Sequence, residues 1–277
     1  MSNWLSVRRG EAPLIIAFPH TGTIIPPEIG KNLVSPWLAR KDSDWGVDRL
    51  YAFAETLDAT FVRTAISRTV IDVNRDPSGV SLYPGQATTA LCPLTTFDGE
   101  PLYREGLEPG VEEVARRRQF FFDPYHDALK AEIARLRRIH PLIIVYDAHA
   151  IRSEIPRLFS GTLPNLNIGT DGGRTASEDL LRGIEACCAN SKFSHVSNGR
   201  FRGGWTTRHY GEPAGGVHAV QMELACRSYM DEPAQVSDHN WPPAFSDARA
   251  AELRLVLTDI LANCIAYAGK CQHEPLR

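Results

Sequence analysis

Three side chains with metal-binding or acid–base chemistry each stand at the end of an apolar segment of strand length: His20, His149 and Glu223. In an open α/β sheet, ligands bind in crevices beyond the carboxyl ends of the strands, so these side chains are expected at one edge. Imidazoles held by rigid strands are natural zinc ligands, and a carboxylate among apolar neighbours has the raised pKa that a general base needs. Asp147 precedes His149 by two residues and can orient its imidazole, because residues i and i+2 of a strand share a face.

The expected site also needs a carboxylate ligand, because a zinc site with two histidines usually adds one and keeps an open position for water. The sequence offers Glu28, Asp44 and Asp48 shortly after His20. Asp44 and Asp48 are four residues apart, so a helix would place them on one face. Asp44 also stands where a helix would begin, which would make it an N-cap. Spacing alone leaves all three carboxylates open.

Polar and cationic residues near these positions can bind carboxylates. Asn74 and Arg75 leave a predicted strand together, and a guanidinium matches a carboxylate with two parallel hydrogen bonds. Arg208 lies in the glycine-containing stretch 203–211, and Arg152 follows His149 closely. Because surface arginines are common, a solvated position explains Arg208 and Arg152 equally well.

The elements that position these residues alternate between strand-like and helix-like patterns, which predicts an α/β protein. We expect a three-layer α/β/α fold with a mostly parallel or mixed central sheet, in a single domain over residues 1–277. Residues 82–109, rich in Pro, Gly and Thr, predict a long loop excursion of the functional kind. The expected strands are 14–18, 60–65, 69–73, 141–146 and 216–224, and the expected helices are 45–57, 111–138, 175–189 and 248–268.

Composition excludes several classes of partner. The 277 residues carry a formal net charge of -3, so neither nucleic acid nor an anionic membrane is an expected partner. No apolar run approaches the roughly 18 residues that span a bilayer, and the start MSNWLSVRRGE does not resemble a signal peptide. The six cysteines form no CxxC pair and are expected to be reduced, which favours a cytoplasmic protein. Oligomeric state is not readable from the sequence.

With these residues in view, the chain resembles the N-formylglutamate amidohydrolase (formylglutamate deformylase) family. The resemblance runs from about Pro13 to Leu224, and the order and spacing of its motifs make it specific. It rests on FPHTG at 18–22, SDWGVD at 43–48, SR at 67–68, DVNR at 72–75, DAHAIRS at 147–153 and TRHYG at 207–211. This family is related in fold to zinc carboxypeptidases and aspartoacylase-like deacylases, so the resemblance implies a zinc carboxypeptidase-like fold.

The resemblance bears on the open choice of metal carboxylate. The related hydrolases carry a His-x-x-Glu motif, but Thr23 stands three residues after His20 in this chain. The carboxylate must therefore come from elsewhere. The family's Asp-x-Gly pattern matches residues 44–46, which implies Asp44 as the ligand.

The family likeness implies the zinc-dependent hydrolysis of N-formyl-L-glutamate to formate and L-glutamate, a reaction of histidine breakdown. Zinc would be bound by His20, Asp44 and His149, although mixed His and carboxylate ligands accept other divalent ions as well. Glu223 would deprotonate the attacking water, and Arg68 would join zinc in stabilising the oxyanion. Asn74 and Arg75, with Arg208, would bind the carboxylates of a small acidic N-acyl amino acid.

Three other functions are compatible with parts of this pattern. A zinc deacylase or carboxypeptidase acting on another N-acyl amino acid or a peptide would share the catalytic residues. A metal-free binding protein on the same fold would have no use for His20, His149 and Glu223 together. A nucleotide-binding Rossmann protein is disfavoured, because no GxGxxG follows the first strand.

Overall fold

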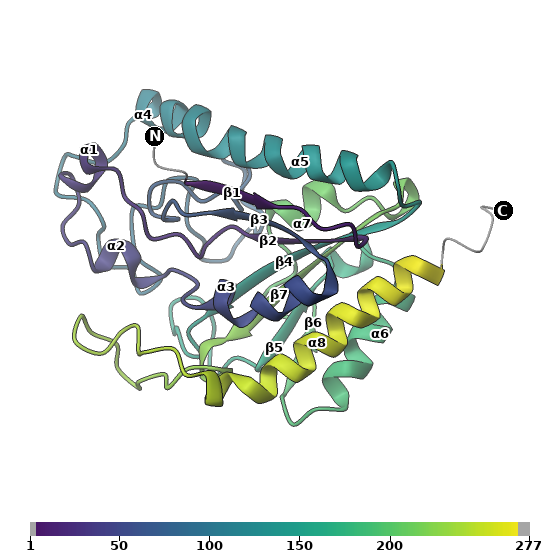
Figure 1. Ribbon diagram of the computed structural model, residues 1–277. Coiled ribbons are helices and arrows are strands. Elements are labelled where there is room, and N and C mark those ends of the chain that lie inside the picture. Colours follow the sequence, from purple (N-terminus) through teal and green to yellow (C-terminus); the bar gives the residue numbers. More distant parts are fainter. Residues whose placement is uncertain (1–3, 271–277) are drawn as a thin grey trace.

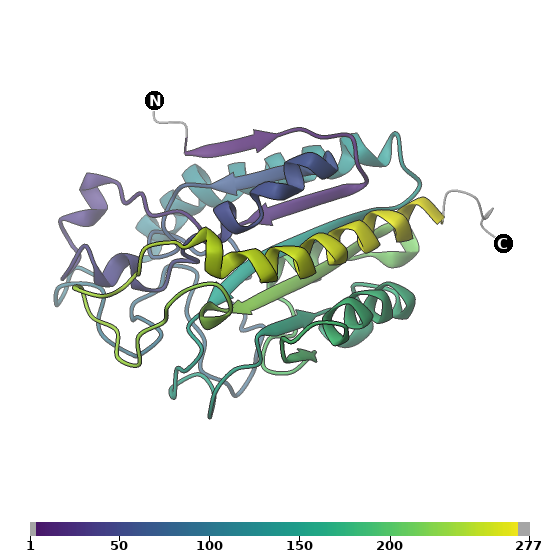
Figure 2. The same cartoon turned by 60° about the horizontal axis from the view of Figure 1, so that its bottom comes forward.

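The computed structural model describes residues 4–270, and a mixed sheet covered by helices on both faces forms its centre (Figures 1 and 2). The described residues contribute seven strands in the order β1-β3-β2-β4-β7-β5-β6. The inner strands β3, β2, β4 and β7 are parallel, while β1 and β5 run antiparallel to their inner neighbours. The strands are β1 Leu5–Arg8, β2 Leu14–Phe18, β3 Thr60–Thr64, β4 Ile143–Ile151, β5 Leu166–Gly169, β6 His195–Ser197 and β7 Val217–Ala225. The expected three-layer α/β/α fold with a mixed sheet is confirmed.

Successive side chains of the buried strands point to opposite faces of the sheet, so they contribute to two apolar cores, one on each face. In β2, Leu14 and Ile16 belong to one core and Ile15 to the other. The core of Ile15 is covered by α4 Val111–Arg117, the π-helix Arg118–Phe122, α5 Asp123–Arg137 and α7 Trp205–Tyr210. The opposite core is covered by α3 Val47–Leu50, the 3-10 helix Ala52–Leu57, α6 Glu178–Ala189 and α8 Asp247–Lys270.

The outer helices begin at residues that cap them. The Ser177 hydroxyl accepts a hydrogen bond from the backbone N–H of Leu180 at the start of α6, and Ser246 accepts one from Arg249 at the start of α8. None of the helices between residues 4 and 270 combines the length and the apolar character that a membrane-spanning segment needs.

Long loops gather at the end of the sheet where β2, β4 and β7 finish (Figure 1). These loops contain the short helices α1 Pro27–Gly30 and α2 Leu38–Lys41. Within the described residues, only isolated bridges and turns lie between Thr64 and Val111. This irregular segment includes residues 82–109.

Three predicted elements differ from the observed ones in type or continuity. Residues 69–73 were expected to form a strand, but Val70 closes a turn with Ser67 and the N–H of Asp72 bonds to the Leu91 carbonyl. Apolar β-branched side chains bury this segment in the core without strand pairing. The expected helix 45–57 divides at Tyr51, where ψ is 5°, into α3 and a 3-10 helix. The expected helix 111–138 contains a π-helical segment before Pro124, which lacks the N–H of a regular turn.

The predicted strand 141–146 extends to Ile151, so His149 lies within β4 rather than after it. The extension forms because β7 continues alongside as a parallel partner, with His149 directly opposite Glu223.

The cysteines of residues 4–270 are all free thiols, as the lack of a CxxC pair predicts. Cys92, Cys188, Cys226 and Cys264 are buried and Cys187 is half-buried. Cys271 lies outside the described residues.

The core under α8 gives a matched pair for a stability test. Leu257 is fully buried, whereas Leu255 on the same helix is 67% exposed. We expect Leu257→Ala to lower the free energy of unfolding by about 2–5 kcal/mol, because it leaves a cavity in the core. Leu255→Ala should change it by no more than about 0.5 kcal/mol. Urea unfolding of both variants measures the difference, and equal effects would contradict this packing.

Candidate metal centre

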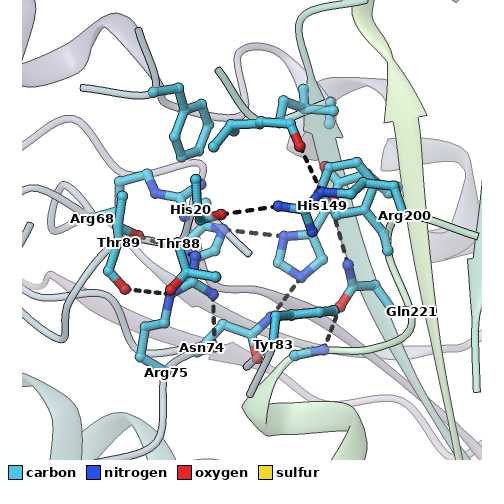
Figure 3. A pocket seen from close by; sticks show the side chains of 18 residues that line it. His20, Arg68, Asn74, Arg75, Tyr83, Thr88, Thr89, His149, Arg200 and Gln221 are labelled. Atoms are coloured by element: carbon cyan, nitrogen blue, oxygen red, sulfur yellow. Dashed lines mark hydrogen bonds between the residues drawn. The ribbon is translucent and has the colours of Figure 1, made fainter. Parts of the chain in front are cut away.

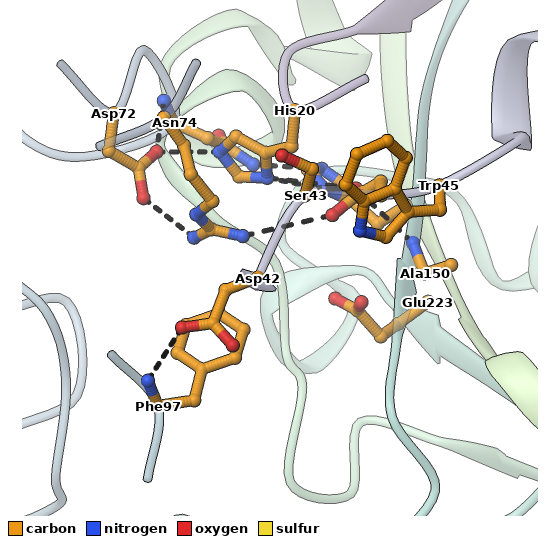
Figure 4. Close-up of polar contacts among 12 residues, drawn as sticks. His20, Asp42, Ser43, Trp45, Asp72, Asn74, Phe97, Ala150 and Glu223 are labelled. Carbon is orange, nitrogen blue, oxygen red and sulfur yellow. Dashed lines mark hydrogen bonds and ion pairs between the residues drawn. The ribbon is translucent and has the colours of Figure 1, made fainter. Parts of the chain in front are cut away.

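Three donor atoms from segments far apart in the sequence meet at one edge of the sheet: Nδ1 of His20 (labelled in Figure 4), Nδ1 of His149 and Oδ2 of Asp44. The two ring nitrogens are 3.1 Å apart, and the Asp44 oxygen lies 3.1 Å from His149 and 3.7 Å from His20. Ligands of one tetrahedral zinc ion lie about 3.3–3.6 Å from one another. These buried groups can therefore hold a single metal ion.

The geometry selects among the three carboxylates that the sequence left open. Asp44 is 1% exposed, its backbone N–H bonds to the His20 carbonyl at 3.0 Å, and its Oδ2 accepts the N–H of Ala150 at 3.2 Å. These bonds attach the Asp44 loop to the ends of β2 and β4. Asp48 forms an ion pair with an arginine near the surface, and Glu28 is exposed in α1. Among residues 4–270, Asp44 is the carboxylate that groups with the two histidines.

Each imidazole contacts a carboxylate through its other nitrogen. His20 Nε2 lies 2.6 Å from Asp72 Oδ1, and His149 Nε2 lies 2.9 Å from Asp147 Oδ2. Metal-binding histidines almost always donate this second N–H to a carboxylate, carbonyl or water. If a metal ion is bound and the protons lie on Nε2, both Nδ1 lone pairs face the same point, as two ligands of one cation must.

The surroundings of these donors carry excess negative charge. Asp44, Asp72 and Asp147 are each at most 1% exposed, and the buried cation Arg68 lies 2.7 Å from Asp72 and 3.8 Å from Asp44. Burial alone would lower the pKa of His149, but Asp147 and the other carboxylates outweigh it and hold that pKa well above its usual range. The excess of buried negative charge around these ligand atoms suits a divalent cation.

Glu223 stands beside the metal-binding group because β7 pairs with β4 in the register that places it opposite His149. Its Oε2 accepts a hydrogen bond from Gln221 Nε2 at 3.0 Å. Burial raises the pKa of Glu223 to about 7, with Asp44 adding to the effect. The carboxyl group can therefore exchange a proton near neutral pH.

Arg68 lies between two of these carboxylates. Its guanidinium donates to Asp72 at 2.7 Å and lies 3.8 Å from Asp44. The ring of Phe97 covers the guanidinium at 4.8 Å. Arg68 thus reaches the cavity as a cation in a defined orientation.

A cavity opens in front of these groups, and its wall includes most of the predicted site residues (Figure 3). His20, His149, Glu223, Arg68, Asn74 and Arg75 line it, together with Tyr83, Thr88, Thr89, Phe97, Arg200, Phe201 and Gln221. Sequence reasoning missed Tyr83, Thr88, Thr89, Arg200 and Gln221. Only Gln221 carried a usable signal, since it precedes Glu223 by two residues on one strand and so shares its face.

The structure places Asn74 and Arg75 differently within this wall. Both atoms of the Asn74 amide are engaged, because Oδ1 accepts from Thr206 N at 2.7 Å and Nδ2 donates to Asp147 at 2.9 Å. Arg75 donates to the carbonyl and the hydroxyl of Thr89 and lies 3.6 Å from Asp72. The Arg75 guanidinium is therefore held against the loop side of the cavity.

Arg208 and Arg152 are not part of this wall. Arg208 covers the ring of Tyr83 at 5.0 Å and lies 3.5 Å from Asp171. Arg152 is buried and forms an ion pair with Asp98 at 2.6 Å. Each of these guanidiniums is held by partners within the protein.

Comparison with known proteins relates the chain to one family. The family model described as N-formylglutamate amidohydrolase matches residues 12–230. A protein named N-formylglutamate deformylase from Pseudomonas aeruginosa is 44% identical over 268 residues, which cover 96% of this chain and 98% of that protein. A protein of the same name from Pseudomonas putida is 41% identical over 271 residues, which cover 98% of each.

Solved structures agree in fold. The N-formylglutamate amidohydrolase from Ralstonia eutropha JMP134 superposes with a TM-score of 0.78 at 21% identity, covering 96% of this chain and 98% of that one. A gene product from Agrobacterium tumefaciens superposes with a TM-score of 0.68 at 17% identity, covering 98% and 96%. At these identities the likeness concerns the fold alone.

The candidate metal-binding group predicts that replacing Asp44, but not the nearby Asp48, weakens zinc binding. We expect the wild-type protein to bind about one zinc ion per chain, because three donors converge on one point. Asp44→Asn should reduce zinc binding strongly, since the amide lacks the negative charge, and Asp48→Asn should leave it unchanged. Titration calorimetry with elemental analysis measures the stoichiometry. Unchanged zinc binding by the Asp44 variant would remove Asp44 from the ligand set.

Proposed function

This chain belongs to the N-formylglutamate amidohydrolase family, and from that membership we propose that it hydrolyses N-formyl-L-glutamate to formate and L-glutamate with a divalent metal ion, zinc first. One observation carries the proposal: the donors of His20, Asp44 and His149 lie within 4.8 Å of one another, with Glu223 beside them. The names of relatives at 44% and 41% identity support the substrate. By the same family likeness, we place the reaction in histidine breakdown in the cytoplasm.

Zinc bound at His20, Asp44 and His149 would supply a Lewis acid that lowers the pKa of water and polarises the formyl oxygen. Glu223 is the proton carrier in this proposal. Its Oε2 is engaged by Gln221, so Oε1 takes the proton as the water oxygen attacks the formyl carbon. When the carbon–nitrogen bond breaks, Glu223 returns this proton to the departing amine, and formate and glutamate leave.

Arg68 acts on the charge that develops on the formyl oxygen. Asp72 and the ring of Phe97 hold its guanidinium at the cavity wall, so little reorganisation is needed during the reaction. A preorganised cation in a site with little water stabilises an oxyanion more than water does. Arg68 is thus the protein's own electrophilic group.

Arg75 is the guanidinium that we assign to a substrate carboxylate. The amide of Asn74 has a supporting role: it donates a hydrogen bond to Asp147, the carboxylate that contacts His149. Arg208 supports the wall through the ring of Tyr83, and Arg152 supports it through the loop of Asp98.

Replacement of the proton carrier tests the mechanism. Glu223→Gln should lower the rate of formate release by about 10²–10⁴-fold, because the amide cannot accept the proton. Zinc content should stay at the wild-type level, since Glu223 is not among the three proposed ligands. Glu112→Gln, a change at an exposed position on α4, is the matched control and should keep full activity. Full activity of the Glu223 variant would remove this residue from the mechanism.

Metal removal and substrate comparison test the reaction itself. Formate release from N-formylglutamate should stop when a chelator removes the metal and return when zinc is added. N-formylaspartate and N-acetylaspartate should react more slowly, because they differ in chain length or acyl group. Failure to release formate with zinc present, together with turnover of another N-acyl amino acid, would move the chain to the broader deacylase class.

A further inference from the structure

Arg200 is a cation in the cavity wall that forms no salt bridge within the described part of the chain, although Glu223 lies near enough to raise its pKa. It lies in the irregular segment between β6 and α7 and is half-buried. Its Nε donates to the Leu158 carbonyl at 2.9 Å, and one terminal nitrogen donates to the Ala87 carbonyl at 3.0 Å. A guanidinium has five N–H groups, so most of its donor capacity is left for a ligand.

Arg68 and Arg75 each lie close to a carboxylate, and Arg200 differs from them in this respect. Those two guanidiniums lie 2.7 and 3.6 Å from Asp72, whereas the contacts of Arg200 with residues 4–270 are to neutral carbonyls and aromatic rings. Burial lowers the pKa of Arg200 and the like charge of Arg75 adds to this effect, while Tyr83 and Glu223 act in the opposite direction. Charges removed from water are normally paired, so the half-buried Arg200, which forms no salt bridge of its own and lies beside the cation Arg75, favours an incoming anion.

The surroundings of Arg200 hold its guanidinium in one orientation. The ring centroids of Tyr83 and Phe201 lie 5.4 and 5.2 Å from it. The Tyr83 hydroxyl donates to the Gly203 carbonyl and accepts the N–H of Arg202, which fixes Tyr83 to the segment that carries Arg200. Preorganisation of this kind lowers the entropic cost of binding a ligand.

Arg75 and Arg200 come to the cavity from different segments (Figure 3). Arg75 lies with Asn74 and Thr89, and Arg200 lies on the side of Gln221. Two guanidiniums in one wall match a molecule that carries two carboxylates.

We propose that Arg200 binds the side-chain carboxylate of the substrate while Arg75 binds the other, so that this pair selects acidic N-acyl amino acids over those with a neutral side chain. The inference rests on the proposed function for the identity of the acyl group, but recognition of a dicarboxylate does not depend on that group. In this proposal Arg200, rather than Arg208, is the second arginine that binds a substrate carboxylate.

The decisive comparison uses N-formylglutamate and N-formylglutamine, which differ in the charge of one terminal group. Arg200→Met should lower kcat/KM for N-formylglutamate by roughly 10–150-fold, the range of a hydrogen bond to a charged group. It should change kcat/KM for N-formylglutamine by less than about threefold, because the missing charge has no partner there. Arg202→Met, an exposed change two residues away, is the matched control and should leave both values unchanged.

A second variant and a binding measurement separate this inference from the proposed function. Arg200→Lys keeps the charge without the fork and should give an intermediate loss on N-formylglutamate alone. Glutarate should bind the wild-type protein more tightly than its monoamide, and Arg200→Met should abolish that preference whether or not the protein releases formate. Equal losses on both formyl substrates, or a preference for glutarate that survives in Arg200→Met, would overturn the assignment.

Discussion

A concentration of buried negative charge at one edge of the sheet is the constraint that the rest of this molecule accommodates. Asp44, Asp72, Asp147 and Glu223 lie there together with two imidazoles, and Arg68 compensates only part of their charge. Carboxylates removed from water are costly unless they are paired or coordinate a metal. This negative charge is therefore compensated in two ways. The Nε2 atoms of His20 and His149 contact the carboxylates of Asp72 and Asp147, and the Nδ1 atoms form, with Asp44, a group of ligand atoms that suits a cation.

The apolar framework holds these groups close together despite their repulsion. Parallel pairing of β2, β4 and β7 brings three strand ends to one edge, and cores on both faces hold the strands in register. The loop that carries Asp72 is held from the helical layer behind it. Arg117 donates to the Val70 carbonyl at 3.0 Å, and His126 Nε2 lies 2.8 Å from the Val73 carbonyl. These contacts give an irregular segment the rigidity of the strands beside it.

The residues of the site come from two kinds of segment, strands and loops. Strands β4 and β7 carry His149 and Glu223, His20 follows β2 directly, and a loop attached to these strand ends carries Asp44. Loops supply Arg68, Arg75 and Arg200, which belong to segments with few regular hydrogen bonds and are held instead by aromatic rings and carbonyls. Under the proposed function, the groups at the strand ends carry out the hydrolysis and the loop arginines select the substrate carboxylates.

The sequence by itself determined the fold class and three of the central residues, because the carboxyl ends of parallel strands meet at one edge wherever the chain runs in between. His20, His149 and Glu223 were readable on that ground. Tertiary structure decided the rest: Asp44 over its neighbours, the continuation of β4 to Ile151, and the placement of Arg200. Each of these depends on contacts between segments far apart in the chain. The loop of Asp44 is attached to strand ends, β4 continues because β7 lies alongside it, and Arg200 is placed by Tyr83, which contacts the segment before α7. Local residue patterns carry no record of such contacts.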